Sequence, residues 1–217
     1  MKKSVFILGT DTGIGKTYVA VRIIRHMREA GICVGVMKPY SAGKSANSGA
    51  KSEDAHALAR AAGVTPNPNI NPDHQEMEAS PYTRCVMGHV PPDPQDMIRQ
   101  YKVLESRFDV MVVEGMGGCM VPILHDYYMA DLARDMGLPA IMVSDNRIGA
   151  VNHCIMSVYM CRCRDVRLDG IILNIMHTDG YDMDVLQNSI EGVLDIPVIG
   201  TIQNGKLVMN QSVATPK

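Results

Sequence analysis

The segment from Gly9 to Thr17, with the sequence Gly-Thr-Asp-Thr-Gly-Ile-Gly-Lys-Thr, has the residue types of a loop that holds phosphate groups. Glycines let successive backbone N–H groups face one anion, Lys16 adds a mobile cation, and the Thr17 hydroxyl can ligate Mg²⁺. An apolar run at residues 5–8 leads into the segment and a helical pattern leaves it. Thr10 stands where the first glycine is usual, so this loop is longer by one residue. The segment predicts nucleoside triphosphate binding.

Lys38 and Glu114 each close an apolar run, at residues 32–37 and 109–113. A carboxylate at such a strand end can reach Mg²⁺ directly or through water, so Glu114 is either a metal ligand or a solvated loop acid. Lys38 is either a ligand-facing cation, held in an extended exit by the proline behind it, or a lysine that reaches solvent. Asp54 lies in the first turn of a helix capped by Ser52. A carboxylate at this position is explained equally well by its favourable interaction with the helix dipole and by a metal or water-mediated role.

Three further segments have the residue types of anion or base recognition. Glycines at 115, 117 and 118 allow a ligand to approach the backbone, and their N–H groups can bind a carboxylate or a phosphate. The turn at residues 147–152 opens a predicted helix and is a second anion-binding end. Asn174 either reads an adenine edge or caps a turn. The two anion-binding segments, at 115–118 and 147–152, suit a substrate that carries a carboxylate.

Strands and helices alternate along the chain. The pattern predicts strands at 5–8, 32–37, 109–113, 139–144, 170–173 and, as the last, 197–202. Helices are predicted at 16–30, 52–63, 129–136 and 183–194, with two more that begin near Asp93-Pro94 and near 149. This alternation favours an α/β fold with a mostly parallel, doubly wound sheet and helices on both faces. The candidate residues then meet at the carboxyl ends of the strands.

Two stretches lack a clear hydrophobic periodicity. Residues 41–50 are small and polar and are predicted to form a loop, and residues 64–93 contain many prolines and asparagines. A connection of that length is uncommon unless it has a function, so we expect 64–93 to be an ordered covering loop.

Length and composition fit an ordinary globular protein. The 217 residues are predicted to form a single domain, 1–217. The net charge of -2 gives no general attraction to nucleic acid or to a membrane. The first core strand begins too early to follow a signal peptide, and the apolar runs are too short to span a membrane, so we expect a cytoplasmic protein.

Taken together, these residues resemble the dethiobiotin synthetase family. The resemblance rests on the Gly9 to Thr17 loop, Lys38-Pro39, Ser-Glu-Asp-Ala-His around Asp54, Val-Val-Glu-Gly-Met-Gly-Gly at 112–118, the helix start at 148–153 and Ile-Leu-Asn at 172–174. It implies a P-loop NTPase-like fold and a ligase that uses ATP and Mg²⁺ to close the ureido ring of 7,8-diaminononanoate with CO₂. The reaction passes through a carbamate and a carbamic-phosphoric anhydride.

The resemblance also implies roles for individual residues. The catalytic residues would be Lys16, Lys38 and Thr12, and the Mg²⁺ ligands would be Thr17, Asp54 and Glu114. Nucleotide binding falls to Gly13, Ile14, Gly15, Lys16, Thr17, Tyr18, Asn174 and Gln203. Substrate binding falls to Ser41, Glu114, Gly117, Gly118, Gly149, Ala150, Val151 and Asn152. Members of the family are homodimers in which the helix start of one subunit holds the substrate carboxylate of the other.

The chain departs from the family pattern in three places. Ser41 comes one position early, so Ala42 stands before the following glycine. The last predicted strand leads into Gln203 and an Asn-Gly pair rather than a proline-containing segment, and Met116 replaces the usual alanine. The first departure concerns a hydroxyl near the carbamate, and the second concerns recognition of the base. The third concerns the shape of the pocket beside Glu114.

Two other functions are also consistent with these residues. One is a nucleotide-driven switch of the partitioning ATPase type, although such proteins carry a second lysine where Thr10 stands here. The other is a related ligase that acts on another acid, such as a cobyrinate-type amidoligase, which usually requires an attached glutaminase domain.

Overall fold

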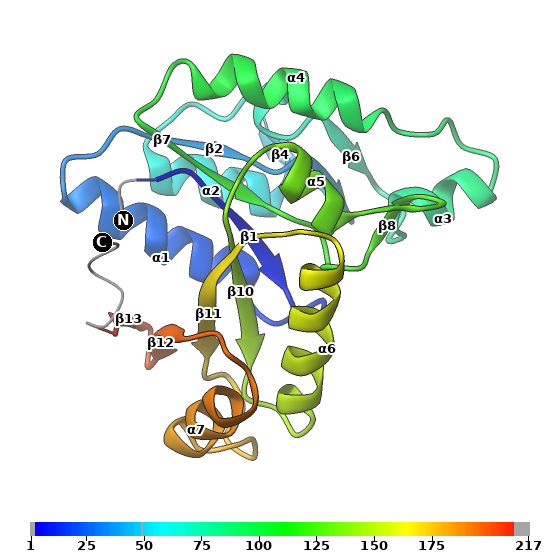
Figure 1. Ribbon diagram of the computed structural model, residues 1–217. Coiled ribbons are helices and arrows are strands. Elements are labelled where there is room, and N and C mark those ends of the chain that lie inside the picture. The colour runs from blue at the N-terminus through cyan, green and yellow to red at the C-terminus, as the bar shows by residue number, and fades with distance from the viewer. Residues whose placement is uncertain (1–2, 49, 211–217) are drawn as a thin grey trace.

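The computed structural model describes residues 3–48 and 50–210, and in these residues a seven-stranded sheet forms the centre of the fold (Figure 1). The strand order is β13-β12-β11-β10-β1-β7-β2. All neighbouring strands are parallel except β12 and β13. The strands are β1 (Val5–Gly9), β2 (Val34–Met37), β7 (Val110–Glu114), β10 (Ala140–Asp145), β11 (Leu168–Asn174), β12 (Val198–Gln203) and β13 (Lys206–Met209). The predicted mostly parallel sheet is confirmed.

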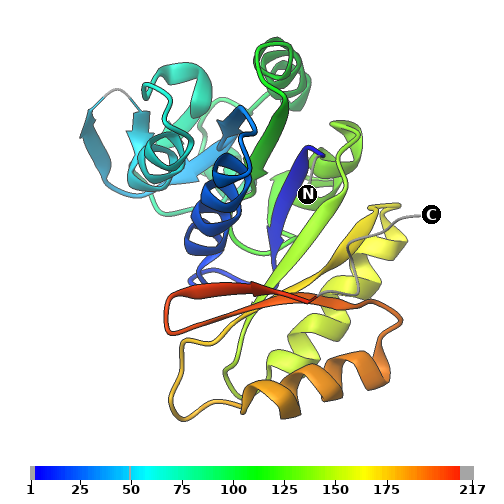
Figure 2. The same cartoon turned by 90° about the vertical axis from the view of Figure 1, so that its left-hand side faces the viewer.

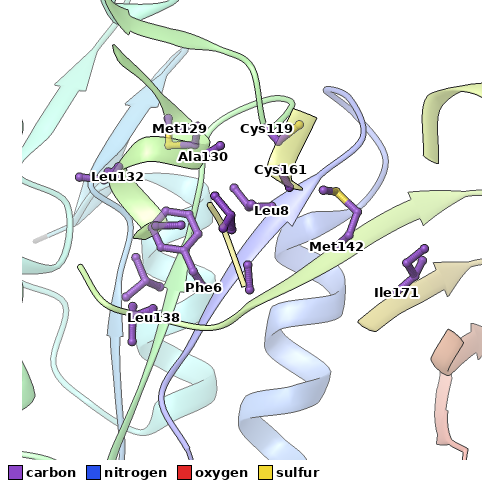
Figure 3. Packing of buried hydrophobic residues seen from close by; sticks show 14 of the residues in the cluster. Phe6, Leu8, Cys119, Met129, Ala130, Leu132, Leu138, Met142, Cys161 and Ile171 are labelled. Carbon is purple, nitrogen blue, oxygen red and sulfur yellow. The ribbon is translucent and has the colours of Figure 1, made fainter. Parts of the chain in front are cut away.

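Helices cover both faces of this sheet, as Figures 1 and 2 show. One face packs on α1 (Lys16–Glu29) and α2 (Glu53–Ala62), and the other on α4 (Pro94–Glu105), α5 (Met129–Asp135), α6 (Ala150–Cys163) and α7 (Met183–Val193). Alternate side chains of β1 serve the two cores: Val5 and Ile7 face α1, whereas Phe6 and Leu8 face α5 and α6. Figure 3 shows Phe6 and Leu8 among the side chains of this second core. The doubly wound α/β class is therefore confirmed.

Local signals at two helix starts are also confirmed. The Ser52 hydroxyl accepts a hydrogen bond from Ala55 N at 3.2 Å, and α2 ends at Gly63 with φ 69°. Asp93 Oδ1 accepts from Gln95 N at 2.9 Å, and Pro94 is the first residue of α4. These caps fix where the elements begin, and α2 thereby carries Asp54 in its first turn.

The segment at 64–93, which we call the covering segment, has elements of its own: η1 (Pro68–Ile70), β6 (Asp73–Gln75) and α3 (Pro81–Val86). Strand β6 pairs in parallel with β3 (Tyr40–Ala42), with Ser41 opposite His74. The prediction of a plain loop at 41–50 is thus wrong, because β3 finds its partner in a distant segment. Two small hairpins complete the elements, β4 (Ser45–Ser48) with β5 (Ala50–Ser52) and β8 (Pro122–Leu124) with β9 (Tyr127–Tyr128).

The strand predicted at 197–202 is not the last one. Strand β12 turns back into β13 through Asn204 and Gly205, which have φ 49° and 76°. Figure 2 shows this hairpin in red at the edge of the sheet. An Asn-Gly pair is a strong local signal for such a turn, so the sequence contained the information. Among the helices that the structure describes, none is long and apolar enough to cross a membrane.

Candidate active site

The loop that follows β1 is held in shape by its neighbours. Thr10 N donates to Val143 O of β10 at 3.0 Å, and Gly15, the N-cap of α1, has φ 84°. A Cβ atom at Gly15 would lie 2.2 Å from Asn174 Nδ2, and that amide donates to Ile14 O at 3.0 Å. Only glycine fits this position, both for its left-handed backbone and for the space available. Asn174 therefore buttresses the loop from the end of β11.

Lys16 lies inside this loop and is 7% exposed. Its ammonium donates to Asp11 O at 2.8 Å. Burial first, and then the charge of Lys38, lower the pKa of Lys16 from 10.5 to about 8. Burial and Lys38 outweigh the nearby carboxylates of Glu114, Asp54 and Asp11, so an anionic ligand beside this ammonium would favour its charged form.

Four side chains from four elements meet beside the loop. Glu114 Oε1, at the end of β7, accepts hydrogen bonds from Thr17 Oγ1 at 2.7 Å and from Lys38 Nζ at 2.5 Å. Lys38 Nζ also lies 2.8 Å from Asp54 Oδ2. The structure thus brings together the hydroxyl, the strand-end cation and both candidate carboxylates, in what we call the Lys38 cluster.

The charges of the Lys38 cluster stabilise one another. Burial disfavours the charged form of Lys38, but Glu114 and Asp54 outweigh it and raise the pKa of Lys38. Burial likewise opposes ionisation of Asp54, while Lys38 outweighs it and holds the pKa of that carboxyl below its usual value. Both groups are accordingly ionised at neutral pH.

The oxygens of this cluster fit a magnesium ion. Glu114 Oε2 is buried and has no hydrogen-bond partner in the described part of the chain. Two carboxylates and a hydroxyl are ligands that Mg²⁺ takes together with phosphate oxygens and water. No group of three or more His, Cys, Asp or Glu side chains suited to a metal occurs in residues 3–48 and 50–210, so a metal here would rely on a ligand's oxygens.

The glycines after β7 lie directly against the phosphate loop. Cys119 N donates to Gly9 O at 2.9 Å, and a Cβ at Gly118 would lie 3.3 Å from Thr10 O. A Cβ at Gly117 would lie 3.2 Å from Thr12 Oγ1. Met116, the bulky departure, packs against the core on the α5 and α6 side. The two loops therefore form one backbone surface that side chains would block.

The start of α6 is tied to the phosphate loop through an ion pair. Arg147 Nη2 donates to Asp11 Oδ2 at 2.5 Å, and Arg147 Nε is buried without a hydrogen-bond partner among the described residues. Gly149 is the N-cap of α6 with φ 97°. The next three residues run from buried to exposed: Ala150, Val151 and Asn152.

Ser41 and the expected base-binding residues lie at two further places. Ser41 is buried and contacts Asn71 and His74 of the covering segment. Tyr18 is 39% exposed, and its hydroxyl accepts from Arg22, whose Nε donates to Gly205 O at 2.9 Å. Gln203 is exposed and pairs with Lys206 in the β12–β13 hairpin. Tyr18 therefore lies beside the turn of this hairpin.

A family model described as an AAA domain matches residues 3–212. The chain is 39% identical over 211 residues to the ATP-dependent dethiobiotin synthetase BioD of Nitrosopumilus maritimus, covering 97% of this chain and 92% of that protein. The protein of the same name from Aromatoleum aromaticum is 33% identical over 91% of this chain and 88% of its own length. The chain belongs to the dethiobiotin synthetase family. The predicted membership is confirmed.

Solved structures similar to this member of the dethiobiotin synthetase family share its fold. Chloroplast FtsY from Physcomitrella patens has a TM-score of 0.58 at 18% identity and covers 97% of this chain, which spans 62% of the FtsY chain. A ParA family ATPase from Chlorobium tepidum has a TM-score of 0.55 at 16% identity over 93% of this chain and 85% of its own. Both likenesses support the P-loop NTPase-like architecture.

Sequence reasoning did not single out four residues near the site of this family member. Asn71 and His74 carried no signal, because a proline-rich stretch hides their contacts with Ser41. Asp11 and Arg147 lie in segments that were recognised, yet their pairing was not foreseen. An acidic residue inside an anion-binding loop indicates that a cationic side chain lies beside it, and this signal could have identified the pair.

Proposed function

We propose that this chain is an ATP- and Mg²⁺-dependent dethiobiotin synthetase, a cyclo-ligase that closes the ureido ring of 7,8-diaminononanoate with CO₂. In this reaction one amine takes up CO₂ and releases a proton to give a carbamate. A carbamate oxygen then accepts the γ-phosphoryl group of ATP, and the second amine attacks the carbonyl carbon with loss of phosphate. The observation that carries the proposal is the Lys38 cluster beside the phosphate loop, in a chain of this family.

The chain's own residues would position and neutralise the reacting groups. Backbone N–H groups of residues 13–17 would hold the phosphates, and Lys16 would compensate their charge. Lys38 would exchange a carboxylate contact for the carbamate, and Thr12 would contact the transferring phosphoryl group. Thr17, Asp54 and Glu114 would hold Mg²⁺, whose contribution is to neutralise charge on phosphate oxygens. Asn174, Tyr18 and Gln203 would border the base.

The substrate would extend from the Lys38 cluster towards an anion-binding helix start. Ser41, Gly117 and Gly118 would contact the diamine, and the N–H groups at Gly149 to Asn152 would bind a carboxylate. We propose a homodimer in which that helix start serves the partner's substrate. Its support is the outer face of α6, where Met156 and Tyr159 are 51% and 54% exposed. A cytoplasmic location and the lack of nucleic-acid and membrane partners stay predictions.

The test is direct. Purified protein is incubated with ATP, Mg²⁺, bicarbonate and 7,8-diaminononanoate, and phosphate release is measured with and without the diamine while dethiobiotin is sought by mass. The proposal expects phosphate release that depends on the diamine and a product of matching mass. Lys16→Ala and Glu114→Gln should each lower the rate by about a hundredfold or more, as loss of charge stabilisation does.

Matched controls exclude a general effect of surface charge. Lys102→Ala on α4 and Glu29→Gln at the end of α1 change exposed residues of the same types and should keep the native rate. Phosphate release that does not depend on the diamine would point to a switch ATPase instead. Dependence on a different acid would point to a related ligase.

A further inference from the structure

The covering segment holds the backbone around Lys38 and Ser41 from the outside. Lys38 N donates to Ile70 O at 2.7 Å, and Gly43 N donates to Gln75 O at 3.0 Å. Between these two bonds, β3 and β6 run side by side with Ser41 opposite His74. The path of the chain from Lys38 to Gly43 is therefore fixed by residues 70–75.

Asn71 has a single possible orientation in this arrangement. Its side chain is fully buried, and its Nδ2 lies 2.8 Å from Lys38 O. A backbone carbonyl only accepts hydrogen bonds, so the amide must present its NH₂ group to Lys38. The Asn71 Oδ1 atom then faces Ser41 Oγ at 2.9 Å, and because Oδ1 only accepts, the Ser41 hydroxyl must donate.

The polarity of His74 follows in turn. Ser41 has one hydroxyl hydrogen, and Asn71 takes it. The contact of 2.8 Å between Ser41 Oγ and His74 Nδ1 therefore requires the ring to donate. His74 Nδ1 carries a proton whether the ring is neutral or charged. What remains to Ser41 for a ligand is one lone pair, so its hydroxyl can only accept.

We propose that Ser41 is a hydrogen-bond acceptor for an N–H group of the amine substrate, and that Asn71 and His74 are positioning residues that fix this polarity. The inference rests on the proposed function, because it needs an amine beside Lys38. A hydroxyl with its proton directed away cannot stabilise a carbamate oxygen. It can hold an amine by its hydrogen and leave the nitrogen lone pair free to attack.

The first test needs no substrate. Long-range ¹H–¹⁵N correlation spectra of the whole protein, recorded above pH 8 or so where an ordinary histidine is neutral, report which ring nitrogen carries the proton. The His74→Asn variant identifies the signal among the seven histidines of the chain. A protonated Nδ1 supports the proposal. An unprotonated Nδ1 overturns it, whatever reaction the protein catalyses.

The second test separates donor from acceptor at the same position. His74→Asp places a second acceptor opposite Ser41, whose single hydrogen cannot serve both that group and Asn71, so the hydroxyl should be displaced. The KM for the diamine should rise about tenfold while the KM for ATP changes less than about twofold. His74→Asn restores a donor and should return the diamine KM towards the native value. Equal KM values for the two variants would overturn the proposal.

Asn71 is tested in the same way with a matched control. Asn71→Asp keeps the acceptor for Ser41 but removes the donor to Lys38 O, and it should lower kcat by about tenfold or more. Asn69→Asp makes the same change at an exposed position of the covering segment and should have no effect. If native protein shows no diamine-dependent phosphate release, the proposed function fails, and the ring spectrum still decides the polarity of Ser41.

Discussion

Lys38 Nζ and Glu114 Oε1 lie 2.5 Å apart, and the two side chains are only 4% and 0% exposed. A charge removed from water so completely depends on its partner for stability. Asp54 also contacts Lys38, but its side chain is 47% exposed and can turn to solvent. The Lys38 to Glu114 pair is therefore the part of the candidate site on which stability depends most, and the proposed function gives both residues a role in the reaction as well.

Replacement of Lys38 by methionine should lower the free energy of unfolding by about 3–5 kcal/mol, because it leaves the Glu114 carboxylate buried without the cation that contacts it. The double variant Lys38→Met/Glu114→Gln should recover much of this loss. Urea unfolding measures both. Lys102→Met breaks an exposed pair with Glu105 and should cost less than about 1 kcal/mol. Equal losses for Lys38→Met and Lys102→Met would contradict the prediction.

The lowered pKa of Lys16 predicts proton uptake on nucleotide binding. At about pH 9 the free protein holds Lys16 mostly neutral, since its pKa is about 8. Phosphate charge favours the ammonium, so bound protein should take up close to one proton per site there and little below about pH 7. Titration calorimetry of ATP in two buffers of different ionisation enthalpy measures this uptake. Lys16→Met should abolish it; an equal uptake in that variant would assign the proton elsewhere.

The same pKa predicts the sign of a stability effect. Unfolded chain keeps Lys16 protonated up to about pH 10.5, whereas the folded protein releases that proton above about pH 8. Between these values the unfolded state binds more protons, so this residue makes the ligand-free fold relatively more stable as the pH rises. Urea unfolding of native protein and Lys16→Met over this range should show the difference in slope.

Alanine at Gly15 should impair the phosphate loop more than alanine at Gly13. Both glycines have positive φ, 84° and 75°, so each substitution costs about 1 kcal/mol of backbone strain. Only at Gly15 would the new Cβ meet another atom, Asn174 Nδ2 at 2.2 Å. Gly15→Ala should thus weaken ATP binding by about tenfold or more relative to Gly13→Ala. Gly31→Ala, which has open space around it and lies away from the site, serves as the control for strain alone.

The Arg147 to Asp11 pair should matter for binding and little for stability. Its side chains are 34% and 48% exposed, so Asp11→Asn, which removes this pair alone, should change the free energy of unfolding by less than about 1 kcal/mol. Arg147→Met removes more, because Arg147 Nε also lies 3.6 Å from Oδ2 of the buried Asp145. It leaves the Asp11 carboxylate uncompensated in a loop for anions, and the KM for ATP should rise about tenfold at low salt. Asp11→Asn/Arg147→Met should reverse much of that rise. If the double variant binds ATP no better than Arg147→Met, the charge of Asp11 is not the cause.

The outer face of α6 should control the oligomeric state. Apart from Arg162 near its end, this helix carries no Lys, Arg, Asp or Glu, although a helix on a free surface usually presents a charged side. Met156→Glu should shift the protein towards monomer in sedimentation velocity. Val103→Glu, at an equally exposed position on α4, should leave the mass unchanged. A native protein that is monomeric at micromolar concentration would contradict the homodimer.

The main lines of the fold followed from local pattern, because apolar strands, glycine stops and capping residues act over a few positions. Lys16, Lys38 and Glu114 could also be placed near one another in advance, since parallel strands present their carboxyl ends at one edge. Asp54 lies in the first turn of a helix, and only the family resemblance indicated its place beside them. What could not be predicted depends on contacts between distant segments. Ser41 meets Asn71 and His74 only because β3 pairs with β6, and Arg147 meets Asp11 across 136 positions.

Strand β2, which leads to Lys38, is also the last strand on its side of the sheet. An edge strand exposes unpaired backbone groups to which another chain can add, and this is a route to aggregation. Here η1 lies against β2, and Ile70 O accepts a hydrogen bond from the N–H group of Lys38, just past the strand end. Substitutions that loosen residues 68–75 should therefore lower the yield of soluble protein as well as its activity. The stretch of chain that fixes the backbone of Lys38 therefore also shields this edge of the sheet from strand addition by another chain.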